Sequence, residues 1–449
     1  MFRKNRGVQL IKRVTLVRFR WVSRWVVILL MPWLTVPLHA YSVLTHEALV
    51  DALWVIKIRP LLAARFPKAT PEELKEAHGY AYGGAIIQDL GYYPHGSEQF
   101  SDLTHYVRTG DFIEALIAES QTLDEYAFAL GALSHYVSDL DGHRYATNVA
   151  EPMLYPKLRR KFGDVITYEQ DPAAHLKTEF GFDVLEVAKG NFAPQAYHDY
   201  IGFYVAKGSL QRAFRDTYGL NLADVFNDFD RAIGSYRRAV SKTIPKATRV
   251  AWAEKKKDIQ QSNPGITQKR FVYTMSRSSY ERYWGKDYDR PTAGDRMLGV
   301  FLKLVPPIGP LRALHFKMPT AQVETLFMSS FDRSSTQYKQ KLQESQQNAL
   351  SLPDENYDVG AITPPGAYRL EDDVRAYWLD KLAKTNFSGL TPEIQANLLT
   401  YYSNLDVPFD TKKNPKKWDK VLAELKQLKS AQPATEPAIA AAATEQRVR

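Results

Sequence analysis

Strict alternation of apolar and polar positions, the pattern of a half-buried β-strand, is scarce along this chain. The segment Gln268–Met275 is one candidate for a small β-ribbon. Helix-start signals recur instead, with a capping side chain before the first turn and often Pro at its first position. These signals are Thr70-Pro71 with Glu73, Thr122 with Glu125, Asp171-Pro172 and Thr391-Pro392. The pattern predicts an all-α protein.

Composition divides the chain into five segments, of which the first, residues 1–40, is described in the next paragraph. Residues 41–245 hold eight of the ten histidines, and residues 246–320 are basic and rich in Tyr, Trp and Pro. Residues 321–429 are predicted to be largely helical, with helices near 320–349 and 367–404 separated by the loop SLPDENYDVGAITPPGAY. The low-complexity end at 430–449 is predicted to be a disordered tail.

The first forty residues have the features of a secretory signal peptide. Residues 1–24 contain eight Lys or Arg and no acidic residue, and an apolar run at 25–38 then ends at His39-Ala40. Fourteen residues interrupted by two prolines are short for a membrane span. We therefore expect export to the periplasm or the medium, with a mature chain that begins at Tyr41. The alternative is an uncleaved anchor that keeps the protein at a membrane.

Composition and charge restrict the chemistry available to the chain. The 449 residues are 45% hydrophobic, which allows a large core, and they include no cysteine. Disulfides and thiolate metal sites are excluded, so a bound metal needs imidazole and carboxylate ligands. The formal net charge is +9, but without the eight basic residues of the predicted signal peptide it falls to +1. The remaining positive charge is concentrated in residues 231–320.

The segment ALGALSHYVSDLDGHRYATN contains the strongest local signal. Thr122 is predicted to start its helix and Gly142 to end it. His135 and Asp139 are four residues apart and therefore share one helix face, whereas His143 falls where the chain is expected to turn. An imidazole and a carboxylate at this spacing can hold a zinc ion. Taken alone the pair is weak evidence, because such pairs are common on helix surfaces and in cores.

A second pair repeats this spacing. His175 and Glu179 are four residues apart in DPAAHLKTEF, and His143 could complete a three-residue set with an open position for water. Three further candidates lie upstream. Asp89 follows an apolar helical stretch, His105 is sixteen residues later, and His46 is near the predicted mature N-terminus.

Together these residues resemble the zinc-dependent phospholipase C family, which includes the catalytic domain of the glycosylphosphatidylinositol-specific phospholipase D. The resemblance covers about residues 41–200 and depends on the order His, Asp, His, His-x-x-x-Asp-x-x-x-His, His-x-x-x-Glu. It implies a multi-helix metal-binding domain, shared with fungal zinc nucleases. The largely helical C-terminal extension is predicted from the residue pattern alone.

The resemblance also implies how two or three zinc ions would be held. One set is Asp89, His105, His135 and Asp139, and a second is His143, His175 and Glu179. A third is His46 with the α-amino and carbonyl groups of Tyr41 and a shared Asp139. This third set requires signal cleavage, because only a free amine can ligate. Family members begin the mature chain with Trp, whereas this one would begin with Tyr41.

The resemblance implies a phospholipid or membrane-surface substrate, with Asp89 as zinc ligand and general base for the attacking water. The basic segment 246–320 suits a membrane interface through Tyr273, Tyr280, Tyr283 and Trp284, although its composition also suits single-stranded nucleic acid. Glu179 favours the phospholipases, since the nucleases have Asp there. The alternatives are a nuclease on the same scaffold and a non-catalytic zinc-binding surface protein. No obligate protein partner is evident.

Overall fold

Helices form almost all of the regular structure in the computed structural model, which describes residues 43–189, 191, 204–238, 244–271 and 316–433. Within these residues the β-type pairing is a single isolated bridge between Asn356 and Ala361. The prediction of an all-α protein is therefore confirmed. The predicted ribbon at Gln268–Met275 is wrong over its first half, because Gln268–Phe271 forms a helical turn; the rest of it lies outside the described residues.

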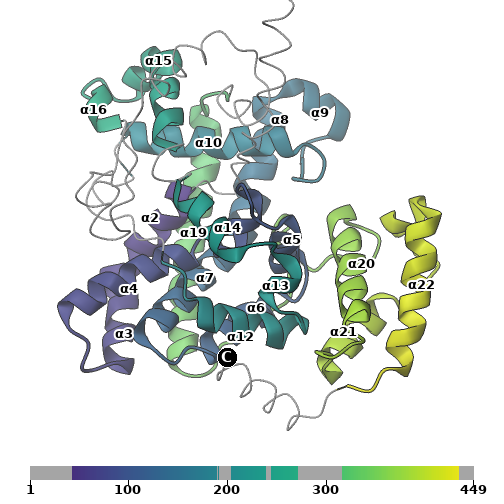
Figure 1. Ribbon diagram of the computed structural model, residues 1–449. Coiled ribbons are helices and arrows are strands. Elements are labelled where there is room, and N and C mark those ends of the chain that lie inside the picture. Colours follow the sequence, from purple (N-terminus) through teal and green to yellow (C-terminus); the bar gives the residue numbers. More distant parts are fainter. Residues whose placement is uncertain (1–42, 190, 192–203, 239–243, 272–315, 434–449) are drawn as a thin grey trace, which may run out of the picture.

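The helices are labelled in Figure 1. The N-terminal series is α2 Val43–Leu53, η1 Trp54–Ile58, α3 Arg59–Arg65, α4 Pro71–Gly84, η2 Ile87–Tyr92, α5 Glu98–Tyr106, α6 Thr109–Ala118, α7 Leu123–Gly142, η3 His143–Thr147, α8 Asn148–Leu154, α9 Pro156–Phe162 and α10 Pro172–Lys189. The remaining series is α12 Lys207–Tyr218, α13 Leu222–Val225, α14 Phe229–Arg238, α15 Ile244–Ser262, α16 Gln268–Phe271, α19 Ala321–Gln346, α20 Arg369–Lys384, α21 Pro392–Tyr401, η6 Asp410–Lys413 and α22 Pro415–Ser430.

The predicted helix starts are present. Thr70 and Thr122 form capping boxes at the first turns of α4 and α7. In each box the Thr hydroxyl accepts a hydrogen bond from the backbone N–H of the Glu three residues later, and the carboxylate of that Glu accepts one from the Thr backbone N–H. Thr391 accepts from the first turn of α21, and Asp171 Oδ1 accepts from the Ala174 N–H at 2.9 Å where α10 begins. These starts were predictable because each depends on residues at most three positions apart.

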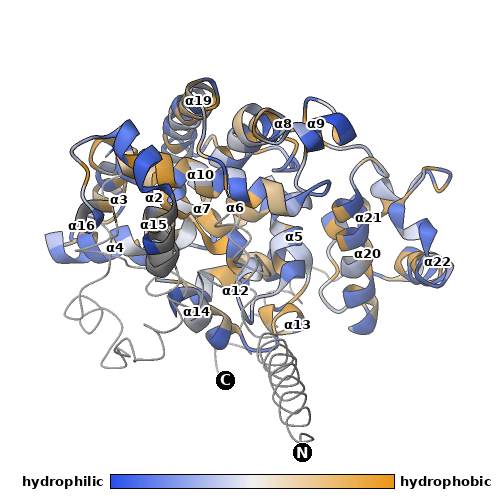
Figure 2. Ribbon diagram, turned by 90° about the horizontal axis from the view of Figure 1, so that it is seen from above, coloured by the Kyte–Doolittle hydropathy of each residue, from blue (hydrophilic) through white to orange (hydrophobic). Residues whose placement is uncertain are grey.

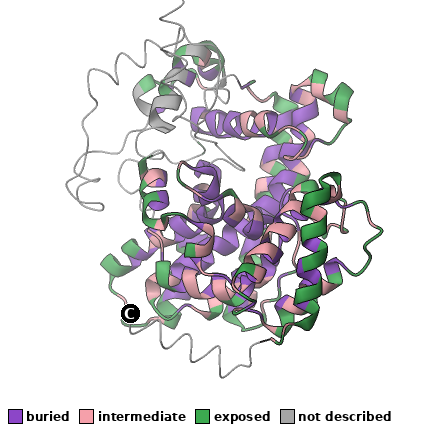
Figure 3. Ribbon diagram, turned by 45° about the vertical axis from the view of Figure 1, so that its right-hand side comes forward, coloured by how far each residue is buried: buried purple, intermediate pink, exposed green. Residues whose placement is uncertain are grey.

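Helix α7 is the central helix, and α4, α6 and α19 pack around it. It is buried from Tyr126 to Gly142. Figure 3 shows the buried residues gathered in the middle of the helices and the exposed ones toward the outside. Two glycines allow α4 and α7 to approach closely. A Cβ at Gly131 would lie 1.9 Å from the carbonyl oxygen of Ala81, and one at Gly84 would lie 1.9 Å from that of Phe128.

The chain does not turn after α7, contrary to the prediction. The α-helix ends at Gly142 as expected, but a π-helical turn, His143–Thr147, continues it directly into α8. A π-turn holds one more residue than an α-turn, and such insertions are frequent at functional sites. His143 itself keeps α-helical dihedral angles, and its N–H donates to the Asp139 carbonyl, so its side chain continues the face of α7 that carries Asp139.

The C-terminal helices pack onto the N-terminal ones. Helix α19 lies along α7, where the Tyr338 hydroxyl donates to the Leu130 carbonyl at 2.8 Å. Helix α20 packs on α5, and the Trp378 indole N–H donates to the Tyr218 carbonyl at 2.7 Å. Helices α20, α21 and α22 form the layer on the right of Figure 1, with mainly hydrophilic outer faces in Figure 2.

Several predicted features lie outside the described residues. They are the signal peptide at 1–40, Tyr41, the aromatic residues Tyr273, Tyr280, Tyr283 and Trp284, and residues 434–449 of the predicted tail, whereas its first residue, Ser430, ends α22. Among the helices that the structure does describe, none combines the length and the apolar character needed to cross a bilayer.

Candidate metal centre

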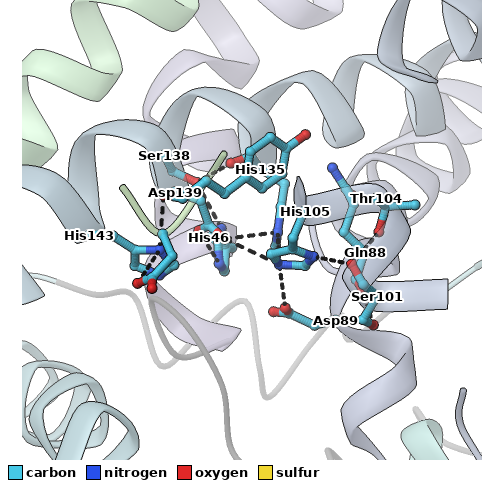
Figure 4. Close-up of polar contacts among 12 residues, drawn as sticks. His46, Gln88, Asp89, Ser101, Thr104, His105, His135, Ser138, Asp139 and His143 are labelled. Carbon is cyan, nitrogen blue, oxygen red and sulfur yellow. Dashed lines mark hydrogen bonds and ion pairs between the residues drawn. The ribbon is translucent and has the colours of Figure 1, made fainter. Parts of the chain in front are cut away.

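Eight side chains predicted as metal ligands meet in the interior of the N-terminal helices, and Figure 4 labels six of them. They come from α2, η2, α5, α7, η3 and α10, and none is more than 3% exposed. These residues are His46, Asp89, His105, His135, Asp139, His143, His175 and Glu179. Tyr41, the ninth predicted ligand, lies outside the described residues.

Asp139 is at the middle of the first group. Its Oδ2 lies 3.1 Å from His135 Nε2 and 3.6 Å from His105 Nε2, and its Oδ1 lies 3.4 Å from His46 Nε2. Asp89 Oδ1 is 3.4 Å from His105 Nε2. Two sets of three have potential ligand atoms within 4.8 Å of one another: His105, His135 and Asp139, and His46, Asp89 and His135. His46 therefore adjoins the first predicted set, and its ring stacks on His135 with centroids 4.4 Å apart.

The second group joins the end of α7 to α10. Glu179 Oε1 lies 2.6 Å from His175 Nε2 and 3.5 Å from His143 Nε2. These three residues are the set that the sequence predicted. Each offers one potential ligand atom, and the three atoms lie within 4.8 Å of one another. The helical spacing of four residues places His175 beside Glu179, and His143 reaches them from the end of α7.

Hydrogen bonds at Nδ1 fix the tautomers of His105 and His135. The Nδ1 of His105 is 2.8 Å from the Ser101 carbonyl oxygen, and that of His135 is 2.9 Å from the Ala85 carbonyl oxygen. A carbonyl oxygen can only accept, so each Nδ1 must carry a proton, and a neutral ring then has its lone pair on Nε2. The two Nε2 atoms are 3.4 Å apart. Two facing lone pairs repel unless a cation, either a proton or a metal ion, lies between them.

The surrounding charge attracts such a cation. Burial opposes a charge on His105, but the carboxylates of Asp139 and Asp89 outweigh it and raise its pKa to about 10. Burial also opposes the charge of Asp139, yet the imidazoles of His135 and His143, together with contacts to His105, bring its pKa well below the usual value. The group is therefore a buried anionic centre with nitrogen donors around it.

His46 and His143 are oriented in the same way. The Ser138 hydroxyl donates to the His135 carbonyl at 3.1 Å, so its oxygen accepts from His46 Nδ1 at 2.9 Å. Burial, helped by the neighbouring His135, lowers the pKa of His46 to about 4, which keeps its ring neutral at physiological pH. His143 Nδ1 donates to the Tyr357 carbonyl at 3.1 Å. In both rings Nε2 is left as the ligand atom.

Glu151 is a member of the site that the sequence analysis missed. It is completely buried on α8, and its Oε1 lies 2.9 Å from His175 Nδ1, on the far side of the ring from Glu179. Burial raises the pKa of Glu151 to about 8, against the opposing effect of His175. A carboxylate behind a ligand imidazole is the usual support of a zinc-bound histidine. Glu151 had no spacing relation to a histidine that would have singled it out.

The loop between α19 and α20 also contributes to the site. The Tyr357 N–H donates to the His105 carbonyl at 3.0 Å, and its ring centroid lies 5.2 Å from that of His105. Asp358 is buried next to it and accepts at Oδ2 from the Tyr168 N–H at 2.9 Å and the Tyr368 hydroxyl at 2.5 Å. No local sequence signal connects this loop with histidines more than 200 residues earlier.

The donor set fits zinc. It consists of imidazole nitrogens and carboxylate oxygens without thiolate, a combination that zinc accepts in tetrahedral or five-coordinate sites. Both carboxylate oxygens of Asp139 and of Glu179, and Oδ1 of Asp89, are buried without a contact of hydrogen-bond geometry in the described part of the chain. Buried carboxylate oxygens in this state are costly unless a cation compensates them.

Comparison with known proteins agrees with this chemistry. The family model described as zinc-dependent phospholipase C matches residues 45–228, a segment that contains all eight converging side chains and Glu151. Tyr357 and Asp358 lie beyond the matched segment. No match was found among curated proteins or among solved structures.

Proposed function

Because residues 45–228 belong to the zinc-dependent phospholipase C family, we propose that this chain is an exported zinc-dependent phosphodiesterase that hydrolyses phospholipids. One observation carries the proposal. The His105 and His135 rings, each held by a backbone carbonyl at Nδ1, direct their Nε2 atoms toward the buried oxygens of Asp139. Such convergence costs free energy without a cation and is the arrangement that a polynuclear zinc site requires.

We assign the ligands to the sets that the family resemblance implies, and the close approach of their side chains supports this assignment. Asp89, His105, His135 and Asp139 would hold one ion, and His143, His175 and Glu179 a second. A third ion would use His46 and Asp139 together with the amine and carbonyl of Tyr41. The third ion would make activity depend on signal cleavage, because an acylated nitrogen at Tyr41 cannot ligate.

Zinc bound in this centre would neutralise phosphate oxygens and lower the pKa of a bound water toward neutrality. The chain's own residues would do the rest. Asp89 Oδ1, which is buried next to His105, would accept a proton from the attacking water. The carbonyls of Ser101 and Ala85 would keep the rings in one tautomer throughout the reaction. Burial would strengthen every charge interaction by excluding bulk water.

The proposal is tested by offering the purified chain two phosphodiesters, phosphatidylcholine and single-stranded DNA, with and without a chelator. We expect release of phosphocholine that stops on chelation and returns with added zinc. Cleavage of DNA without lipid hydrolysis would instead identify a nuclease on the same scaffold. Bound zinc with neither activity would identify a non-catalytic zinc-binding protein.

A further inference from the structure

Helix α9, which connects α8 to the loop before α10, presents an unusually basic surface. Four of its seven residues are cationic and exposed, and the helix contains no buried residue. These cations are Lys157, Arg159, Arg160 and Lys161. In Figure 1 the helix lies at the edge of the molecule, and in Figure 2 its outer surface is strongly hydrophilic.

Little of this charge is neutralised locally. Arg159 pairs with Asp164 at 2.6 Å, with both side chains mostly exposed. Among the residues that the structure describes, no carboxylate forms an ion pair with Lys157, Arg160 or Lys161. At helical periodicity these three cations fall within an arc of about 100°. They therefore form one positively charged face.

Apolar groups lie beside these cations at the end of the helix. Gly163 ends α9 with φ of +97°, and a Cβ there would have no atom within 4 Å, so the turn projects into open space. Val165 follows with 54% of its surface exposed. The half-buried Phe162 lies under the Lys161 ammonium group, which is 4.3 Å from its ring centroid. We refer to Pro156–Val165 as the basic tip.

The basic tip is connected to the candidate metal centre through a short segment. After Val165, the Ile166 N–H donates to the Asn148 carbonyl at 3.0 Å, which returns the chain to α8. Tyr168 then places the edge of its ring against His175, with centroids 5.4 Å apart. Only two residues therefore separate the exposed Val165 from Tyr168, whose side chain contacts a proposed zinc ligand. A surface bound at the tip would lie near the second ligand set.

We propose that the basic tip is the docking surface for an anionic phospholipid membrane. This inference depends on the proposed function for the identity of the substrate but not for the binding itself. Clustered Lys and Arg attract anionic headgroups, and exposed valine beside them can enter the interfacial region of a bilayer. Single-stranded nucleic acid would use the cations and stacking aromatic rings but would gain nothing from an exposed valine.

The test measures co-sedimentation of the zinc-loaded full chain with vesicles of non-hydrolysable phosphonate lipids, with or without an anionic headgroup. The variant K157Q/R160Q/K161Q should bind anionic vesicles roughly 100-fold more weakly, because each cation near the surface contributes about a factor of five. The control K416Q/K426Q/K429Q removes the same charge from exposed positions on α22 and should bind as the wild type does.

Two further measurements make the outcome specific. Val165→Ser keeps the charge and should weaken vesicle binding several-fold. Vesicle binding by K157Q/R160Q/K161Q equal to that of the control would overturn the proposal. The proposal would also be overturned if K157Q/R160Q/K161Q lost binding to single-stranded DNA while it still bound anionic vesicles as the wild type does.

Hydrolysis of a soluble substrate distinguishes a failure of the proposed function from a failure of the docking proposal. The K157Q/R160Q/K161Q variant should hydrolyse a monomeric short-chain phospholipid at the wild-type rate, because the substitutions do not reach the ligand sets. A wild-type chain that binds anionic vesicles but hydrolyses neither lipid form would disprove the phospholipase assignment. It would leave the docking surface established.

Discussion

At the scale of single residues, the site depends on what lies behind each imidazole. A backbone carbonyl supports His105, His135 and His143, a hydroxyl supports His46, and a carboxylate supports His175. The carbonyl and hydroxyl partners hold a proton at Nδ1 in the first four rings, so Nε2 is the atom that faces the neighbouring carboxylates. The Nε2 atom of His175 likewise faces a carboxylate, at 2.6 Å from Glu179 Oε1. The supports therefore determine the ligand atoms before any metal arrives.

Glu151→Gln tests this role for a support that does not itself ligate. The amide can still contact His175 Nδ1, but it cannot ionise as Glu151 does above its pKa of about 8, and that charge makes the imidazole a stronger donor to zinc. The two proteins are therefore compared above that pH. We expect zinc affinity of one site to fall roughly 10- to 100-fold, measured by competition with a chromogenic chelator. Unchanged affinity for every bound zinc would show that Glu151 is only a buried acid.

Asp89→Asn tests the proposed general base. The substitution preserves size but removes the proton acceptor beside His105, so kcat for phospholipid should fall at least about 100-fold. The matched control is Asp141→Asn, a buried aspartate on α7 whose Oδ1 accepts from Gln337 Nε2 at 3.3 Å. Its kcat should remain near the wild-type value. Equal losses in the two variants would argue against a specific role for Asp89.

The residue scale is also where sequence reasoning was most informative. His135 with Asp139, and His175 with Glu179, could be paired from sequence because helical spacing of four residues alone places them together. Glu151 could not be found in this way. Its approach to His175 depends on how α8 packs on α10, which no short-range pattern encodes.

At the scale of helices, the close approach of α4 and α7 sets the position of the first ligand group. Gly131 lies one turn before His135 and touches the backbone of Ala81, while the Ala85 carbonyl at the end of α4 accepts from His135 Nδ1. The spacing between the two helices therefore also sets the length of that hydrogen bond. A change in this spacing should disturb folding and metal binding together.

Gly131→Ala tests this contact. The added Cβ would lie 1.9 Å from the Ala81 carbonyl oxygen, so the helices must separate, and we expect a loss of at least about 2 kcal/mol in unfolding free energy measured with urea. Gly234→Ala is the control, since a Cβ at that exposed helical position meets nothing within 4 Å. It should stabilise the protein by about 0.5–1 kcal/mol. Destabilisation by both variants alike would contradict the packing argument.

The loop between α19 and α20 gives a second prediction at this scale. Tyr357 is fully buried against the rings of His105 and His135, so Tyr357→Ala should lower unfolding free energy by about 3–5 kcal/mol and weaken zinc binding. Tyr357→Phe keeps the ring and should behave like the wild type in both measurements. If Tyr357→Ala binds zinc as tightly as Tyr357→Phe, the loop does not support the metal centre.

Elements were predictable from sequence where local chemistry decides them. The capping boxes at Thr70 and Thr122 and the helix end at Gly142 required only neighbouring residues. The π-turn at His143–Thr147 was not predictable, because nothing in its composition distinguishes it from a helix end. The role of Tyr357 was equally hidden, since it arises from contacts between distant parts of the chain.

At the scale of the whole molecule, the segment that matches the family model and the C-terminal region pack together around the candidate metal centre. The matched segment ends at residue 228, yet the loop that carries Tyr357 and Asp358 supports His105 and His143 from outside it. Helix α19 packs along the central helix that carries His135 and Asp139. The C-terminal region is thus expected to be necessary for metal binding.

Metal removal should therefore affect the whole fold. Without a cation, the buried oxygens of Asp139 and Glu179 lose their compensation in the core. We expect a chelator to lower the Tm substantially and zinc, added back, to restore it, because a ligand that binds only the folded state stabilises it. Differential scanning calorimetry measures both steps. A Tm independent of chelator would show that the cluster is stable without metal.

The central claim, that these scattered imidazoles and carboxylates form a polynuclear zinc centre, is tested most directly by counting metal. Zinc per chain would be determined by mass spectrometry of the purified full chain after gel filtration in metal-free buffer. The account predicts two or three zinc ions per chain, with at least one lost in His135→Ala. Fewer than two zinc ions per wild-type chain, even after incubation with excess zinc, would contradict it.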